Sequence, residues 1–179
     1  ETVSRPSVFK RPHGYHLWYT GEARKRAWIG PAVSDDGITW TRELATPAVS
    51  PDRPWEKAAV MAPAATWDPA GKVFCMWYRG GEPPEPDAIG FATSVDGNVW
   101  RKRNDNPVFT ADAKHAWEQH HVAACHVVRR DEWYYVFYAG CGDDGRAQIG
   151  LARSKDGLTN WQRHPKNPIL GPTKDAWDH

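Results

Sequence analysis

The densest group of residues that could do chemistry is the run Glu118-Gln119-His120-His121, followed closely by Cys125 and His126. Imidazole and thiolate groups bind zinc, but a zinc site needs three or four ligands that converge. Along an extended strand His121 and Cys125 point to one side and His126 to the other, and no second cluster completes a ligand set. We therefore predict no metal and no cofactor. We expect His120 and His121 to hydrogen-bond a ligand at one edge of the fold.

The elements that must position these groups follow from an internal repeat. Ile-Gly recurs at residues 29, 89 and 149, and Asp-Gly recurs at residues 36, 96 and 156. An aromatic pair with Gly two residues later begins at residues 18, 77 and 137, and a Trp followed by an acidic residue stands at residues 55, 117 and 177. Markers that stay in step over three copies establish a repeat of about 60 residues.

Each copy contains four short runs rich in aromatic and β-branched residues, which predict strands. The expected strands are 3–10, 15–19, 27–34 and 38–42, then 60–67, 72–78, 88–94 and 99–103, and finally 121–128, 132–138, 148–154 and 160–164. Four antiparallel strands at this period are typical of a β-propeller blade. We predict an all-β fold over 1–179, with blades at about 1–50, 51–110 and 111–172 and with 173–179 leading into the next blade. Most of the 11 Trp should fill the wedges between blades.

Three blades cannot close a ring, so the predicted unit needs a partner. Trp55 precedes Val60 by five residues and Trp117 precedes Val122 by five; in a second copy joined end to end, Trp177 would precede Val3 by the same interval. We expect two chains to join head to tail as a homodimer that closes six blades. A fragment cut at a blade boundary from a longer five-bladed protein would show the same spacing of repeat markers at its ends, and this alternative stays open.

The runs 4–10, 15–21 and 29–40 resemble the repeat of five-bladed glycosidase-type propellers, namely the arabinanase/xylosidase, invertase-like and mannoside-phosphorylase-like families. The resemblance implies carboxylates near the starts of the innermost strands, two of which would hydrolyse a glycosidic bond. The chain departs from that pattern: Arg5 stands before Pro6 where many members have an Asp-Pro, and the matching strands carry Ala62 and Ala124. The hairpin around Asp36, Asp96 and Asp156 resembles the Asp-box of sialidase propellers, in which the aspartate caps its own turn.

Catalytic carboxylates could instead come from loops at the edge of the propeller where the innermost strands begin. Glu82 and Asp143 have no counterpart in the other copies, so we take them as the candidate catalytic pair. The candidate ligand-binding residues are Arg5, Arg79, Trp117, Glu118, His120, His121 and Arg146. The acid after the repeated Trp, as in Glu118, could equally form a framework hydrogen bond. The arginines and histidines would make a mildly positive mouth that could hold an anionic group.

Composition excludes several function classes. The 23 Lys and Arg balance the 22 Asp and Glu, so the basic excess of a nucleic-acid-binding protein is missing. No apolar run approaches the roughly 20 residues of a membrane helix. The three cysteines fit no zinc spacing and indicate reduced, mostly buried thiols; an exported protein could instead hold one disulfide. We expect a soluble protein, with the cytoplasm favoured and the compartment otherwise open.

Two main function classes follow from the resemblance. The first is a carbohydrate-active enzyme, a glycosidase or a glycoside phosphorylase, that uses rim carboxylates and binds its ligand at the channel mouth. The second is a noncatalytic sugar-binding or assembly propeller that lacks the catalytic carboxylates. A ring without a defined ligand is a third interpretation.

Overall fold

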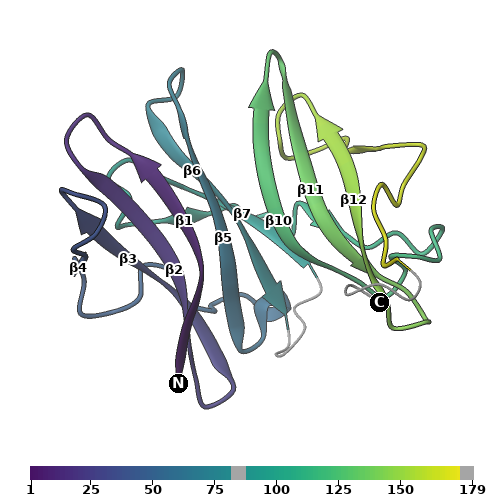
Figure 1. Cartoon of the computed structure of the whole chain (residues 1–179), viewed down its shortest axis with the longest axis horizontal. Helices are drawn as coiled ribbons and strands as arrows, with labels where there is room; N and C mark the ends of the chain where they lie inside the picture. Colours follow the sequence, from purple (N-terminus) through teal and green to yellow (C-terminus); the bar gives the residue numbers. More distant parts are fainter. Residues whose placement is uncertain (82–87, 174–179) are drawn as a thin grey trace.

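The computed structural model describes residues 1–81 and 88–173. Apart from a single turn of 3-10 helix, η1 (Pro54–Glu56), the regular elements in these residues are β-strands. The strands form three antiparallel units side by side, which we call blade 1, blade 2 and blade 3 (Figure 1). A single parallel pair, Ala27 with Ala59, joins blades 1 and 2 into one nine-stranded sheet, and blade 3 is a separate four-stranded sheet. The prediction of an all-β fold is confirmed. No described segment forms a helix with the length and apolar character of a membrane span.

The blades follow one another along the chain. Blade 1 consists of β1 (Thr2–Lys10), β2 (Tyr15–Ala23), β3 (Arg26–Ser34) and β4 (Thr41–Arg42). Blade 2 consists of β5 (Ala59–Asp68), β6 (Val73–Gly81), β7 (Ala88–Ser94) and β8 (Arg101–Lys102), and β9 (Phe109–Thr110) also pairs with β7. Blade 3 consists of β10 (His121–Arg130), β11 (Trp133–Cys141), β12 (Ala147–Ser154) and β13 (Gln162–Arg163). In each blade the chain runs from an innermost strand (β1, β5 or β10) outward.

The outermost strand of each blade is shorter than the sequence predicts. The expected strand 38–42 is regular only at β4, because the carboxylate of Asp36 accepts the backbone N–H groups of Thr39 at 2.7 Å and Ile38 at 2.8 Å. These N–H groups are therefore not available to hydrogen-bond the neighbouring strand. The same two hydrogen bonds hold the pKa of Asp36 well below its usual range. Asp96 and Asp156 make the equivalent contacts, so all three aspartates cap their own turns.

Aromatic side chains fill the space between blades, as the Trp count predicts. Trp18 is fully buried between blades 1 and 2 and meets Phe74 edge-to-face at 5.2 Å. Trp77 is 1% exposed between blades 2 and 3 and lies 5.7 Å from the ring of Tyr134. Large flat rings bury much apolar area at each contact, so the blades stabilise one another rather than folding around separate cores.

The outward faces of blades 1 and 3 have no neighbouring blade among the described residues. Blade 1 has a hollow of about 730 Å³ on that face, lined by Leu17, Tyr19 and Trp40. On blade 3, Val128 and Phe137 are 41% and 39% exposed. Either closure predicted from the sequence, a ring of two chains or a ring within one longer chain, would cover these apolar surfaces.

Candidate functional site

In each blade the start of the innermost strand and the end of the second strand lie at the same edge. Thr2 pairs with Glu22, Ala59 with Gly81 and His121 with Cys141. The start of β1 and the β2–β3 turn lie together at the lower edge in Figure 1. We call this edge the rim, and it is where the sequence predicts the functional residues.

Each innermost strand bulges just after it leaves the rim. The pairing register shifts between Ser4 and Ser7 on β1, between residues 61 and 64 on β5, and between residues 123 and 125 on β10. A bulge inserts one extra residue and turns the backbone, which re-aims a side chain. Arg5 and Ala62 are the turned residues, each with φ of 51°, and the backbone N–H of Ala62 is satisfied by Thr20 Oγ1 at 2.9 Å.

The three bulges therefore carry Arg5, Ala62 and Ala124, where the resemblance implies carboxylates. None of these side chains can donate or accept a proton at neutral pH in the way that an aspartate or glutamate does. The first acidic residue along the three strands is Asp68, at the opposite end of β5. General acid–base chemistry would have to come from rim loops.

Arg5 is anchored at the rim through one of its terminal nitrogens. Its Nη1 donates to Glu22 Oε1 at 2.7 Å and lies 3.4 Å from Ser4 Oγ and 3.6 Å from Met61 Sδ. Ser4 Oγ donates to the same Glu22 oxygen at 3.1 Å. Beside this group lies a hollow of about 560 Å³ that the start of β1, the β2–β3 turn and Met61 line. Arg5, predicted to bind ligand, thus faces an open site.

A second polar group occupies the rim of blade 3. His120 Nε2 lies 2.5 Å from Asp143 Oδ1, and the amide of Gln119 donates to the other Asp143 oxygen. The side chains of His120 and Asp143 are 54% and 76% exposed. The pairing of His121 with Cys141 aligns the loop before β10 with the β11–β12 turn and so brings these residues together. Asp143, a predicted catalytic residue, therefore meets His120, a predicted ligand-binding residue.

Arg79 pairs with Met61 beside the β5 bulge and is buried rather than exposed at the rim. It is 5% exposed on β6, and its charge acts on Cys125 of β10 in the adjacent blade. Burial raises the pKa of the Cys125 thiol to about 12, although the nearby guanidinium opposes that rise. Cys125 is therefore a protonated, unreactive thiol at neutral pH, and no disulfide joins the described cysteines.

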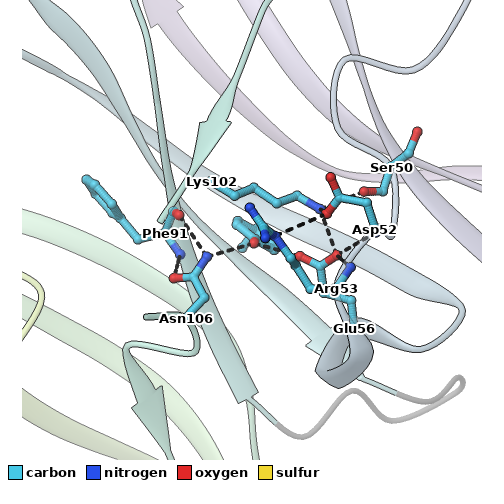
Figure 2. Close-up of polar contacts among 8 residues, drawn as sticks. Ser50, Asp52, Arg53, Glu56, Phe91, Lys102 and Asn106 are labelled. Carbon is cyan, nitrogen blue, oxygen red and sulfur yellow. Dashed lines mark hydrogen bonds and ion pairs between the residues drawn. The ribbon is translucent and has the colours of Figure 1, made fainter. Parts of the chain in front are cut away.

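Two of the acids that follow the repeated Trp, Glu56 and Glu118, are buried in framework contacts, and the third, Asp178, lies outside the described residues. Glu56 is fully buried; it accepts the Tyr78 hydroxyl at 2.8 Å and Lys102 Nζ at 2.7 Å (Figure 2). Glu118 is fully buried as well and accepts Arg163 Nε at 2.6 Å. Trp117 packs against Tyr138 with ring centroids 5.6 Å apart. Glu118 thus makes the framework contact that the sequence offered as its alternative. Trp117, also predicted to contact ligand, packs against the hydrophobic core.

The remaining predicted residues are scattered along the rim. His121 begins β10 and is half-buried, and Arg146 is exposed in the β11–β12 turn. Glu82 lies outside the described residues. The sequence did not assign Glu22 its role as the anchor of Arg5. The clearest signal at this turn was the run Arg24-Lys25-Arg26, three consecutive cations where β2 ends and β3 begins.

Comparison with known proteins gives the same fold. Residues 6–178 match the family described as glycosyl hydrolases family 43. No curated protein matches the sequence.

Among solved structures, Zg3597, a family 117 glycoside hydrolase from the marine bacterium Zobellia galactanivorans, superposes with a TM-score of 0.78 at 20% identity. That superposition covers 95% of this chain and 58% of the other. The sucrose-6-phosphate hydrolase of Lactobacillus gasseri gives a TM-score of 0.73 at 18% identity, over 90% and 33%. The β-1,2-mannobiose phosphorylase of Listeria innocua gives 0.74 at 15% identity, over 97% and 46%. The chain thus spans less than two thirds of the length of these relatives.

Proposed function

Because the chain belongs to glycosyl hydrolases family 43, we propose that it supplies three blades of a carbohydrate-active propeller and that their rim binds a sugar. The observation that carries this proposal is Arg5, which the β1 bulge turns toward a hollow of about 560 Å³. Guanidinium groups donate several hydrogen bonds in a fixed plane, which suits the closely spaced hydroxyls of a sugar ring. The carbohydrate is thus the proposed partner of the rim.

Binding is the function that these residues support best. Glycoside cleavage needs two carboxyl groups at a defined separation, about 5–5.5 Å in retaining enzymes and about 6.5–9.5 Å in inverting ones. The bulge positions offer Arg5, Ala62 and Ala124 in place of such a pair. The three blades would then hold and orient a sugar without attacking it.

Hydrolysis by a rim carboxylate is the second candidate, and the contact of Asp143 with His120 favours it. Asp143 accepts a hydrogen bond from the Gln119 amide and lies against the His120 imidazole, so a carboxylate and an imidazole, two groups used in general acid–base chemistry, meet at an exposed edge. Glu82, the other predicted catalytic carboxylate, lies outside the described residues. Asp143 stands in a turn, and functional groups concentrate in the loops of a rigid scaffold.

A titration of the chain with monosaccharides and disaccharides, followed by protein NMR, tests the binding proposal. Shifts confined to rim resonances would support it, and their absence with every sugar would overturn it. Turnover of aryl-glycosides that disappears in both Glu82→Gln and Asp143→Asn would establish the second candidate. Binding without turnover would leave the first candidate alone.

For the assembly, we propose that a second copy of the chain covers the outward faces of blades 1 and 3. The observations that favour it are the apolar hollow at Leu17 and Tyr19 on one face and the exposed Phe137 and Val128 on the other. Head-to-tail packing of two copies would bury both faces at once and close six blades. Further blades of one longer chain are the rival occupants.

A further inference from the structure

We propose that the hollow beside Arg5 selects an acidic sugar, and that it holds the carboxylate of a uronic acid unit. The inference rests on the proposed sugar-binding function and adds the class of sugar to it. Four cations line the hollow, namely Arg5, Arg24, Lys25 and Arg26, against two carboxylates, Glu1 and Glu22. The Glu22 carboxylate is already engaged by Arg5 and Ser4, so the positive charge is left in excess where a ligand would enter.

The contacts of Arg5 leave one edge of its guanidinium available. All three of its hydrogen-bond contacts among the described residues fall on Nη1. The Nε–H and one Nη2–H, which point the same way, remain for a ligand. That edge presents two parallel N–H groups at the spacing of two carboxylate oxygens, which is the geometry of bidentate recognition.

The hairpin beside the hollow requires a backbone conformation that its two turn residues do not favour. The β2–β3 hairpin closes with a two-residue turn, since Ala23 pairs with Arg26. Both turn residues adopt positive φ, 51° at Arg24 and 61° at Lys25, where Asn-Gly is the favoured sequence. Arg5 has φ of 51° on the opposite side of the same hollow.

Strained backbone is one pointer to a functional side chain, and here it coincides with cations that line a hollow. Glycine or asparagine would close the hairpin with less strain but would remove two cations from the hollow. The proposed carboxylate ligand gives these two cations a role at the hollow. The ion pair of Arg5 with Glu22 does not explain Arg5 itself, since exposed pairs of this kind contribute little to stability.

The test compares galacturonic acid with galactose in calorimetric or NMR titrations of the chain at low salt and at physiological salt. We expect galacturonic acid to bind at least about tenfold more tightly than galactose, because charge-assisted hydrogen bonds exceed neutral ones. That preference should shrink as salt screens the charges. Inorganic phosphate serves as a separate arm: if it binds and galacturonic acid does not, the assignment to an acidic sugar is overturned.

Two variants separate binding from folding. In the double variant Arg24→Asn/Lys25→Gly we expect a higher melting temperature, because the turn is relaxed, together with a loss of the galacturonate preference. The matched control is Lys72→Gly, a positive-φ cation (51°) in the β5–β6 turn at the opposite end of blade 2, which should raise the melting temperature and leave binding unchanged. Arg5→Gln should remove the preference for the acid and keep the rim shape.

The possible results of these titrations test the acidic-sugar assignment separately from sugar binding at the rim. Equal affinity for galactose and galacturonic acid would overturn the acidic-sugar assignment while sugar binding at the rim stands. Failure of every sugar to bind would overturn both. An unchanged preference in Arg24→Asn/Lys25→Gly, with the expected gain in stability, would show that these cations are irrelevant to the ligand and would overturn the site.

Discussion

The indole N–H of Trp18 donates a 2.8 Å hydrogen bond to the backbone carbonyl of Gly97, and this bond joins blade 1 to blade 2. The same relationship joins blades 2 and 3, where Trp77 Nε1 donates to the Gly157 carbonyl at 2.8 Å. In each case a Trp of the second strand reaches the Asp-Gly turn of the following blade. Phe137 stands at the corresponding position of blade 3 and has no N–H to donate.

Removing the two indole hydrogen bonds should lower the free energy of unfolding by different amounts. Gly97 also accepts Trp100 Nε1 at 2.9 Å, so in Trp18→Phe its carbonyl keeps a partner. Gly157 accepts only Trp77 among the described residues, so Trp77→Phe leaves a buried carbonyl unpaired. We expect Trp77→Phe to lower the free energy of unfolding by about 1 kcal/mol more than Trp18→Phe, measured by denaturant titration. Equal losses would mean that the indole N–H groups add nothing beyond their packing.

Acid should weaken the contact between blades 1 and 2 through His16. This residue is fully buried and stacks on Trp18 with ring centroids 4.4 Å apart. Its Nδ1 accepts from Arg11, and its Nε2 lies 3.1 Å from Glu43 Oε2 without hydrogen-bond alignment. Burial, reinforced by the positive charge of Arg11 and partly opposed by Asp96, lowers the pKa of His16 to about 4.

Because the pKa of His16 is lower in the folded state than its ordinary value near 6.5, the unfolded chain binds the proton first as the pH falls. The stability contribution of neutral His16 is complete above about pH 6.5 and is lost progressively down to about pH 4. Thermal unfolding measured across this range should show a decline that is shallower in His16→Gln. The exposed residue His13 provides the control, His13→Gln, which should decline like the unmodified chain. A slope unaltered by His16→Gln would remove His16 as the cause.

The fold could be predicted from the sequence because its markers are local and repeated. Trp18 and Trp77 recur with the Asp-Gly turns, and that periodicity alone requires stacked sheets. The resemblance to an Asp-box already implied that Asp36 caps its own turn. The outermost strands are nevertheless shorter than strand propensity predicts, because that cap withdraws two N–H groups from pairing with the neighbouring strand. Propensity describes each strand but not this competition between side chain and backbone.

The rim was predicted only in part, because its contacts depend on strand register. The juxtaposition of His120 with Asp143 follows from the pairing of β10 with β11, which the sequence does not number residue by residue. Arg5 could be predicted as a departure from the expected carboxylate, but its anchor Glu22 could not. That contact requires the β1 bulge, and a bulge has no reliable signal in a single sequence.

Variants of Glu118 and Arg163 test whether this ion pair stabilises the fold or binds ligand. Arg163→Met leaves the fully buried Glu118 carboxylate without its 2.6 Å partner, so we expect a loss of about 3–5 kcal/mol in the free energy of unfolding. The double variant Glu118→Gln/Arg163→Met removes both charges and should recover much of that loss. Sugar titrations of the folded double variant should match the unmodified chain. A selective loss of sugar affinity there would instead return Glu118 to the binding site.

The outward faces of blades 1 and 3 make the proposed assembly testable with single charges. In a head-to-tail ring of two chains, Phe137 of each copy would meet the Leu17 face of the other, so one substitution would disturb both contacts. We expect analytical ultracentrifugation to give twice the chain mass, and Phe137→Glu and Leu17→Glu each to give the mass of one chain with unchanged circular dichroism. Val95→Glu, at an exposed turn of blade 2, should leave the doubled mass intact. A single-chain mass for the unmodified protein would contradict the two-chain ring and favour the remaining blades of a longer chain as the partners of these faces.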